Sequence, residues 1–370
     1  MRLRPVSAVV MAAGAGTRMK SALPKPLHSL CGRPMLLHVL DALSMIYVDR
    51  VVVVVGHGAE RVTKTLHEEA PADLVLDFVE QHVARGTGDA VSVALTAFPD
   101  DIDSDDGELI VLPGDTPLLT PETLQRLVEE HRDTDAAATL LTARLDDPTG
   151  YGRVLRDREG RVRRLVEEGD ATEAEREIDE VGTSIYCFRR SLLAPALRRL
   201  SPENAQGEYY LTDVVGVLAQ AGHRVAAVPA EDAMETVGVN DRFQLAVAEA
   251  ELRRRINEGW MRAGVTMVDP DRTVVDALVQ LSPDVTLHPG SMLQGRTVVG
   301  VGAVLGPDVR LVDCAVGERA LVEYTVGYDA EIGPAASVGP FAALRPGSHV
   351  PGGATTGPFY TARAGDDESV

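Results

Sequence analysis

Residues 11–19 read MAAGAGTRM, and residues 23–28 read LPKPLH. They follow the apolar run AVV at 8–10, which predicts a first β-strand with a glycine-rich turn at its carboxyl end. Glycines let the backbone approach a ligand closely and leave amide N–H groups free to face phosphate oxygens. Arg18 and Lys25 add positive charge to the same loop. The stretch therefore predicts a nucleoside triphosphate site in a strand-to-helix crevice, but not a Walker A loop, because no Gly-Lys-Ser/Thr follows.

A Gly-x-Gly pair after a strand is often only a turn, but the whole run over residues 11–25 is far more specific. It resembles the signature of sugar-phosphate nucleotidyltransferases. Within them it is most similar to the bacterial bifunctional UDP-N-acetylglucosamine pyrophosphorylase/glucosamine-1-phosphate N-acetyltransferase family. We expect Arg18 and Lys25 to act on the phosphates as catalytic residues, and the resemblance implies the same roles. The other loop residues expected to contact the nucleotide are Met11, Ala12, Ala13, Gly14, Gly16 and Thr17.

Composition narrows the class of protein. The chain has 370 residues, enough for two domains, and a formal net charge of −20, which argues against a nucleic-acid partner. The three cysteines, Cys31, Cys187 and Cys314, are scattered, so we expect neither a disulfide framework nor a cysteine metal site. The N-terminus lacks the apolar segment of a signal peptide, and no stretch reaches about 18 uninterrupted apolar residues. A cytoplasmic protein without a membrane span is expected.

The first part of the chain alternates apolar runs with amphipathic ones. Buried strands are predicted at 51–55 and 109–112, and helices at 34–43 and 121–131. This alternation predicts a Rossmann-like α/β domain over residues 1–240, with a mixed, mostly parallel sheet and a ligand crevice at the carboxyl ends of its strands. Residues 241–264 are expected to form a linker helix between good capping and stop residues.

After residue 264 the periodicity changes. Aliphatic residues recur every six positions, at Val275, Leu281, Leu287, Leu293, Val299, Leu305 and Leu311, and again at Ile332, Val338, Leu344 and Val350. Such a repeat predicts a parallel β-helix over residues 265–358, in preference to loose Gly/Pro-rich strands, with each aliphatic stacked on the next coil. The resemblance implies hexapeptide repeats in a left-handed β-helix. Residues 359–370 are expected to form a tail with an acidic end.

Nucleotidyl transfer joins two anions, so the site must neutralise charge and align phosphates for in-line displacement. Asp115, in LPGDTPLL at 112–119, follows a buried strand. A lone Asp there is usually a turn or cap residue, but this context resembles the family's metal-binding Gly-Asp-Val-Pro-Leu run. The resemblance implies Asn240, in TVGVN at 236–240, as the second ligand, and Asn240 also suits a helix N-cap. Mg²⁺ is the expected ion, because it keeps waters and accepts phosphate ligands.

A second turn is expected to recognise the base. Residues 81–90 read QHVARGTGDA and resemble the family's Gln-x4-Gly-Thr-Gly-His-Ala run. Gln81 would then pair with uracil through its amide, and Gly86 and Thr87 would contact the base. His82 and Asp89 are interpreted as surface residues.

The sugar pocket is where the resemblance weakens. Residues 149–154, TGYGRV, match a family run whose second glycine, here Gly152, offers an N–H to the sugar, and Glu167 matches the sugar-binding glutamate. The family's lysine two residues later is Gly169 here, and its sugar-contacting asparagine is replaced by Gly182. Each loss removes a hydrogen bond worth roughly 1 kcal/mol or more. The identity of the sugar therefore stays open.

The resemblance extends into the β-helix, which in the family forms trimers and binds acetyl-CoA. LRPG at 344–347 is present, so Arg345 could contact a sugar phosphate, but the family's next motif is reduced to FYTAR at 359–363 and the chain then ends. Neither His288 nor His349 has the family's base motif around it. We expect a truncated remnant that has lost acetyl transfer and has a structural or oligomerising role, with a homotrimer as one outcome.

The sequence thus predicts a Mg²⁺-dependent uridylyltransferase that uses UTP and N-acetylglucosamine 1-phosphate. Its product would be UDP-N-acetylglucosamine, a cell-wall precursor. One alternative keeps the chemistry with a different sugar 1-phosphate, because of Gly169 and Gly182. The other is a weakly active paralogue that binds sugar nucleotides or assembles with a full-length enzyme. The sequence retains all four residues expected to act on phosphates and metal, which favours an active enzyme: Arg18, Lys25, Asp115 and Asn240.

Overall fold

The computed structural model describes residues 5–98 and 107–362, which divide into two compact units. Unit 1 comprises the described residues up to His28 together with Pro34–Gln244. Unit 2 comprises Ser29–Arg33 and the described residues from Leu245 onward. The predicted acidic end of the chain lies outside the described residues. The sequence placed the boundary at residue 240 and did not predict that a short segment near the N-terminus belongs to unit 2.

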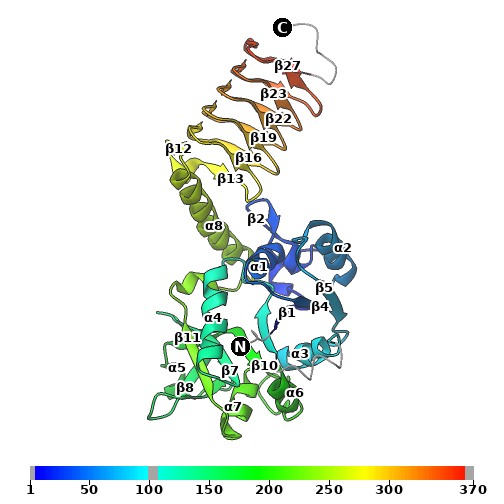
Figure 1. The fold of residues 1–370 in the computed structure, drawn as a ribbon, viewed down its shortest axis with the longest axis vertical. Helices are drawn as coiled ribbons and strands as arrows, with labels where there is room; N and C mark the ends of the chain where they lie inside the picture. Colours follow the sequence, from blue (N-terminus) through cyan, green and yellow to red (C-terminus); the bar gives the residue numbers. More distant parts are fainter. Residues whose placement is uncertain (1–4, 99–106, 363–370) are drawn as a thin grey trace. The chain divides into compact units, whose positions relative to one another are not determined.

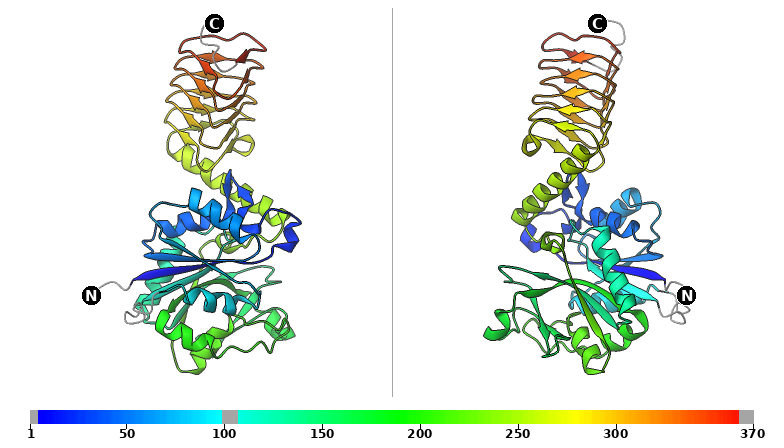
Figure 2. Two further views of the ribbon diagram at one scale, coloured as in Figure 1. Left: turned by 90° about the vertical axis from the view of Figure 1, so that its right-hand side faces the viewer. Right: turned by 60° about the vertical axis from the view of Figure 1, so that its left-hand side comes forward.

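Unit 1 contains a nine-stranded sheet with the order β11-β7-β10-β6-β1-β4-β5, to which β8 and β9 are attached beside β10 (Figures 1 and 2). Its strands are β1 (Val6–Ala12), β4 (Arg50–Val55), β5 (Leu76–Glu80), β6 (Glu108–Pro113), β7 (Ala138–Arg144), β8 (Gly152–Arg156), β9 (Val162–Val166), β10 (Glu180–Arg189) and β11 (Val225–Pro229). β1 is parallel to both β4 and β6, whereas β10 is antiparallel to β6, β7 and β8. The predicted mixed, mostly parallel sheet is confirmed.

Helices cover both faces of this sheet. One core contains side chains of α1 (Met35–Ser44), α2 (Ala59–Glu69) and α4 (Pro121–Asp133); the other contains those of α3 (Thr87–Leu95), α6 (Arg190–Leu197) and α7 (Asp213–Gln220). Successive residues of β1 alternate between the cores: Val10 lies in the first and Val9 in the second. This alternation explains why the central strands are apolar without interruption, since both of their faces are buried.

The strand order places a crevice at β1. The chain passes from β1 to β4 on one side and later returns to β6 on the other, so β1 is a point where the direction of strand progression reverses. Crevices at the carboxyl ends of such strands are the usual ligand sites of α/β sheets. The loop that follows β1 and the one that follows β6 therefore begin side by side, with Met11 paired to Pro113.

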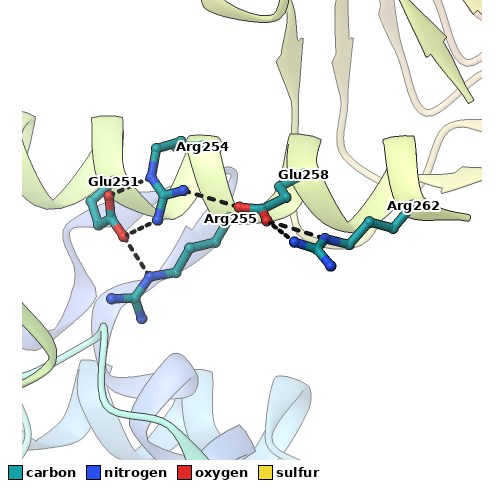
Figure 3. Close-up of polar contacts among 5 residues, drawn as sticks. All are labelled: Glu251, Arg254, Arg255, Glu258 and Arg262. Atoms are coloured by element: carbon teal, nitrogen blue, oxygen red, sulfur yellow. Dashed lines mark hydrogen bonds and ion pairs between the residues drawn. The ribbon is translucent and has the colours of Figure 1, made fainter. Parts of the chain in front are cut away.

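The predicted linker helix is α8 (Arg242–Arg262). Only Ala248 and Asn257 are buried in it, so it has no broad apolar face. Instead, charged side chains form a ladder along it (Figure 3). Glu251 accepts from Arg254 and Arg255 at 2.9 and 2.7 Å, and Glu258 accepts from Arg262 at 2.6 Å. Pairs three and four residues apart lie on one helix face and support a helix that has little core packing.

The rest of unit 2 is a left-handed β-helix with three parallel sheets (Figure 2). The first contains β12 (Thr266–Met267), β15 (Thr286–Leu287), β18 (Val304–Leu305), β21 (Leu321–Val322) and β24 (Ser337–Val338). The second contains β13 (Val274–Val275), β16 (Met292–Gln294), β19 (Arg310–Val312), β22 (Val326–Tyr328), β25 (Ala343–Leu344) and β27 (Thr361–Ala362). The third contains β14 (Gln280–Leu281), β17 (Val298–Val299), β20 (Ala315–Val316), β23 (Glu331–Ile332) and β26 (His349–Val350).

All eleven aliphatic residues of the predicted six-residue repeat are buried, none more than 8% exposed. The interruption between the two runs arises because three steps between inward-facing positions span five residues instead of six: Leu311 to Val316, Val322 to Gly327, and Gly327 to Ile332. One of these positions, Gly327, carries no aliphatic side chain and pairs with Leu311. A Cβ on Gly327 would lie 2.9 Å from Leu311 Cδ2 and 3.4 Å from Cys314 Sγ, so neighbouring side chains already fill the space. The repeat also continues beyond the predicted end at residue 358, because β27 pairs with β25.

Three further features complete the fold. Ser29–Arg33 is fixed within unit 2, since Cys31 N–H donates to the Glu249 carboxylate at 2.8 Å and Cys31 C=O accepts from Ala277 N–H at 2.8 Å. All three cysteines are buried and free. Within residues 5–98 and 107–362, no helix combines the length and the apolar character needed to cross a membrane.

The charged ladder on α8 predicts an acid-dependent contribution to stability. Hydrogen bonds from Arg254 and Arg255 lower the pKa of Glu251 from 4.5 to about 2. A depressed folded-state pKa stabilises the fold above the unfolded value and loses that effect as pH falls toward about 2. Glu251→Gln should therefore lower the melting temperature at neutral pH but not near pH 2, as measured by circular dichroism. An equal difference at both pH values would contradict this role of the carboxylate.

Candidate functional site

A cavity of about 570 Å³ opens at the carboxyl ends of β1 and β6 in unit 1. Fourteen of the residues predicted from the sequence line it: Met11, Ala12, Ala13, Gly14, Arg18, Lys25, Gln81, Gly86, Thr87, Asp115, Gly152, Glu167, Gly182 and Asn240. They come from segments spread over more than 200 positions of the chain. Two predicted residues, Gly16 and Thr17, are not among the lining residues.

Gly16 has a different role in the loop. It has a φ of +60°, and a Cβ there would lie 2.6 Å from the Cβ of Lys25. Only glycine combines this left-handed backbone with so close an approach. Gly16 therefore lets the two parts of the loop meet and brings the Lys25 stem toward the cavity. Thr17 begins the short helix η1 (Thr17–Met19) and is exposed.

A cluster of cationic and oxygen-bearing side chains lies in the cavity. Lys25 Nζ forms an ion pair with Asp115 and donates to Asn240 Oδ1 at 2.8 Å. Arg18 donates to the same Asn240 oxygen at 2.9 Å. Two cations thus converge on one carboxylate and one amide oxygen, which is the charge distribution that a polyphosphate requires.

The backbone around this cluster is fixed by contacts between distant segments. Val239 N–H donates to the backbone C=O of Asp115 at 2.8 Å, which ties the loop after β6 to the segment that contains Asn240. The side chain of Gln244 accepts from Asn240 N–H at 2.7 Å. Asn240 is therefore held from both sides, and its side chain is directed at Lys25 and Arg18.

The same two oxygen-bearing residues have the chemistry of a divalent metal site. Asp115 and Asn240 supply hard oxygen donors, and both already contact a positive charge, the Lys25 ammonium. Among the described residues, no group of three or more His, Cys, Asp or Glu side chains could hold a metal. Asp115 and Asn240 fit a metal that takes its remaining ligands from phosphate oxygens and water.

Gln81 is oriented by a neighbour that the sequence analysis missed. Its Nε2 donates to Asp89 Oδ2 at 2.8 Å and to Gly86 C=O at 3.3 Å. Asp89 was interpreted as a surface residue, but it is only half-exposed and positions this amide. With Nε2 occupied, Oε1 is the group that Gln81 offers to a ligand, and it is an acceptor.

The sugar side of the cavity contains a half-buried carboxylate. Burial raises the pKa of Glu167, and the hydrogen bond from Thr212 Oγ1, 2.9 Å long, opposes this rise. Thr212 precedes α7, so the start of that helix fixes the rotamer of Glu167. A carboxylate held in this way can accept hydrogen bonds from the hydroxyl groups of a sugar.

Gly182 lies where β10 bulges, between residues paired with β7. A Cβ there would lie 2.3 Å from Leu165 Cδ2, a side chain that is only 3% exposed. Leu165 therefore occupies the space of any larger residue at 182. Ser184 follows with a φ of +62° and also lines the cavity. Glycine at position 182, where the sequence departs from the family pattern, is therefore the residue that the packing of Leu165 allows.

Several cavity residues were not among the predicted site residues, notably Tyr151, Thr183, Ser184, Glu208, Thr212 and Gln244. Tyr151 and Glu208 lie in sequence runs that resemble the family's, so the sequence could have identified them as site residues. Nothing in the sequence marked Gln244, because its contact with Asn240 depends on the position of α8.

Comparison with known proteins agrees with this geometry. Residues 8–225 match the model of the MobA-like NTP transferase domain. The chain belongs to the GlmU family. Similar proteins include three named Bifunctional protein GlmU. The one from Halalkalibacterium halodurans is 46% identical over 93% of this chain and 73% of its own length. The one from Brevibacillus brevis is 45% identical over 99% of this chain and 78% of its own length. The one from Streptomyces coelicolor is 47% identical over 98% of this chain and 74% of its own length.

Membership of the GlmU family makes this chain a nucleotidyltransferase that acts on a nucleotide and a sugar phosphate. Enzymes of this class generally use a divalent metal. The cavity supplies the matching groups, namely two cations for phosphates and two oxygen donors for a metal.

The cluster predicts a large effect of one substitution. Asp115→Ala removes the one carboxylate that contacts Lys25 among the described residues and should lower turnover about a thousandfold, on the order of 4 kcal/mol of barrier. Pyrophosphate release measures the effect, and a melting curve checks the fold. The control is Glu122→Ala, an exposed carboxylate of α4 outside the cavity, which should keep the full rate. Near-normal, metal-dependent activity of Asp115→Ala would reject the assignment.

Proposed function

We propose that the protein transfers UMP from UTP to N-acetylglucosamine 1-phosphate, releases pyrophosphate and so makes UDP-N-acetylglucosamine for cell-wall synthesis. The observation that carries the proposal is the meeting of Arg18, Lys25, Asp115 and Asn240 in one cavity. Gln81 and Glu167 line the same cavity, where a pyrimidine and a sugar would each need a polar partner. The relationship to proteins named Bifunctional protein GlmU supports this choice.

In the reaction, the sugar 1-phosphate replaces pyrophosphate on the α-phosphorus of UTP. A phosphate oxygen of the sugar 1-phosphate forms a bond to the α-phosphorus of UTP, and the bond to the bridging oxygen of the β-phosphate breaks. Pyrophosphate leaves with that electron pair. Arg18 and Lys25 hold the phosphates and offset the charge that accumulates on the equatorial and leaving oxygens. Backbone N–H groups of the loop after β1 keep the triphosphate aligned.

Mg²⁺ is the proposed metal, held by Asp115 and Asn240. When bound it neutralises phosphate charge. Lys25 contacts both of these residues, so binding of metal and substrate would require the lysine to exchange these contacts for phosphate oxygens. Lys25 is then positioned by its packing on Gly16 rather than by Asp115.

Selection of uracil follows from the orientation of Gln81. Its Oε1 would accept the N3–H of uracil, since Nε2 is already bonded to Asp89 and Gly86. Cytosine presents a lone pair at N3, so two acceptors would face each other. Sites built on such buried hydrogen bonds reject bases that leave them unpaired.

This orientation predicts a preference for UTP over CTP, ATP and GTP that depends on Asp89. Asp89→Asn lets the amide at 89 donate, so Gln81 can turn its Nε2 toward the base. The ratio of kcat/KM for UTP over CTP should fall at least tenfold, about 1.4 kcal/mol. His82→Asn, a change at an exposed neighbour, is the control. An equal rate with ATP in the unaltered enzyme would reject the uridine assignment.

One specific observation favours the second candidate, the same transfer to a different sugar 1-phosphate. Gly169 and Gly182 leave two positions of the sugar pocket without a polar side chain, and Leu165 fills the space beside Gly182. A panel of sugar 1-phosphates in the same pyrophosphate-release assay separates the two candidates. N-Acetylglucosamine 1-phosphate is expected to give the highest kcat/KM, and a higher value for another sugar would favour the second.

We further propose that unit 2 does not catalyse acetyl transfer to an amino sugar. The histidines of residues 265–362 are His288 and His349, and the imidazole of His349 lies 3.4 Å from the Glu331 carboxylate. Neither lies in a sequence run that resembles the family's base motif, so the Glu331 contact of His349 alone does not make an acetyltransferase site. Incubation with acetyl-CoA and glucosamine 1-phosphate should release no free thiol above background. Steady release that depends on the amino sugar would overturn this part of the proposal.

A further inference from the structure

Unit 1 has a second cavity, of about 670 Å³, that shares no lining residue with the first. It lies between the turn that joins β8 to β9 and the segment that joins α7 to β11. Five of its lining residues are basic: Arg156, Arg161, Arg163, His223 and Arg224. The only acidic residue that lines it is Glu130. Such a concentration of basic side chains is unexpected in a chain with a net charge of −20.

Three of the arginines are held in place by carboxylates. Arg156 donates to Glu180 at 2.6 Å, and both Arg161 and Arg163 contact Asp157, at 2.9 and 2.8 Å. Arg161 also contacts Glu159 at 3.0 Å. These pairs fix the guanidinium groups around the cavity and offset part of their charge.

The remaining two basic side chains have no such partner. Within residues 5–98 and 107–362, neither the guanidinium of Arg224 nor the imidazole of His223 forms a hydrogen bond or ion pair with another residue, although the Arg224 backbone C=O accepts from Ala137 N–H. Arg163 shares Asp157 with Arg161, so one carboxylate serves two guanidinium groups. The cavity therefore offers Arg163 and Arg224 to an anion, and guanidinium groups bind phosphate through paired N–H donors.

The cavity is connected to the first one by three elements that reach both. β8 starts at Gly152 in the first cavity and ends at Arg156 in the second. β9 runs back from Val162 in the second cavity toward Glu167 in the first. α7 follows Thr212, whose hydroxyl holds Glu167, and its Ala219 lines the second cavity.

These three elements also pack on one another. β8 and β9 are hydrogen-bonded as an antiparallel pair from Arg153–Val166 to Arg156–Val162, and α7 packs against β9. A shift of the β8–β9 turn or of the end of α7 is therefore transmitted to Gly152 and Glu167 through regular, packed elements. Packed elements of this kind can carry coupling between two sites.

We propose that the second cavity is a regulatory site for a small phosphorylated metabolite of the size of a hexose phosphate. Its volume lies within the range of small-molecule sites and exceeds what a free phosphate needs. Binding of the phosphate to Arg163 and Arg224 moves the β8–β9 turn and changes the affinity of the first cavity for the sugar 1-phosphate. This last step rests on the proposed function, whereas binding to the second cavity does not.

Alanine methyl groups report on the two cavities separately. Ala219, Ala226 and Ala227 line the second, whereas Ala12, Ala13 and Ala90 line the first. The full chain, labelled with ¹³C at alanine methyl groups, is titrated with glucose 6-phosphate and, separately, with inorganic phosphate. Glucose 6-phosphate should shift the resonances of Ala219, Ala226 and Ala227 and bind more tightly than phosphate. Shifts confined to Ala12, Ala13 and Ala90, or none, would overturn the site; equal affinity for phosphate would overturn the metabolite.

The test variant is Arg163→Gln/Arg224→Gln. It leaves Asp157 paired with Arg161 and removes no partner of Arg224, so no carboxylate becomes unpaired. Affinity for glucose 6-phosphate should fall about tenfold or more. Arg164→Gln is the matched control, because Arg164 lies on the same strand, is exposed and bonds to Glu175 outside the cavity. Equal loss in both variants would show a non-specific charge effect and overturn the proposal.

Coupling is measured last, as the KM for the sugar 1-phosphate with and without glucose 6-phosphate. The unaltered enzyme and Arg164→Gln should show a change of KM at nearly constant kcat, and Arg163→Gln/Arg224→Gln should show none. Methyl shifts at the second cavity without a change of KM would overturn the regulatory role. An enzyme inactive with every sugar 1-phosphate would instead count against the proposed function, because the binding measurement does not require turnover.

Discussion

The contact between Lys25 and the two oxygen donors, Asp115 and Asn240, is the constraint on which the rest of the site depends. It exists because β1 lies between β4 and β6, so that the loops after β1 and β6 start at one edge of the sheet. The segment before α8 closes the arrangement through the hydrogen bond from Val239 to Asp115. Nucleotide chemistry at this edge therefore needs three distant segments of the chain to be in register.

Two lining residues of the first cavity, Gln81 and Glu167, are each held in one orientation by a hydrogen bond to a neighbouring side chain. Asp89 determines which atom of the Gln81 amide is left for a ligand, and Thr212 determines where the Glu167 carboxylate lies. Both act through a single hydrogen bond on a residue that the sequence singled out. Under the proposed function, specificity for base and sugar would thus depend on side chains that need not touch either.

Patterns with a local physical cause were readable from the sequence. The glycine-rich loop, the carboxylate after a buried strand and the six-residue repeat each follow from short-range geometry, and the sheet and the buried hexad positions confirmed the fold. Long-range contacts were not readable. Nothing in the sequence marked Asp89 as a partner of Gln81, Ser29–Arg33 as part of unit 2, or Arg163 and Arg224 as neighbours in one cavity. The break in the repeat comes from steps of five residues, which a strict six-residue period does not match, and from Gly327, whose space is filled by Leu311 of another coil.

The central claim is that a divalent metal and a nucleotide share the cluster formed by Lys25, Asp115 and Asn240. Paramagnetic broadening by Mn²⁺ tests it directly, in the presence of UTP and with ¹³C-labelled alanine methyl groups. The account predicts selective loss of the Ala12 and Ala13 signals, which line that cavity, while Ala226 and Ala227 stay sharp. Broadening centred on Ala226 and Ala227, or no broadening at Ala12 and Ala13, would contradict it.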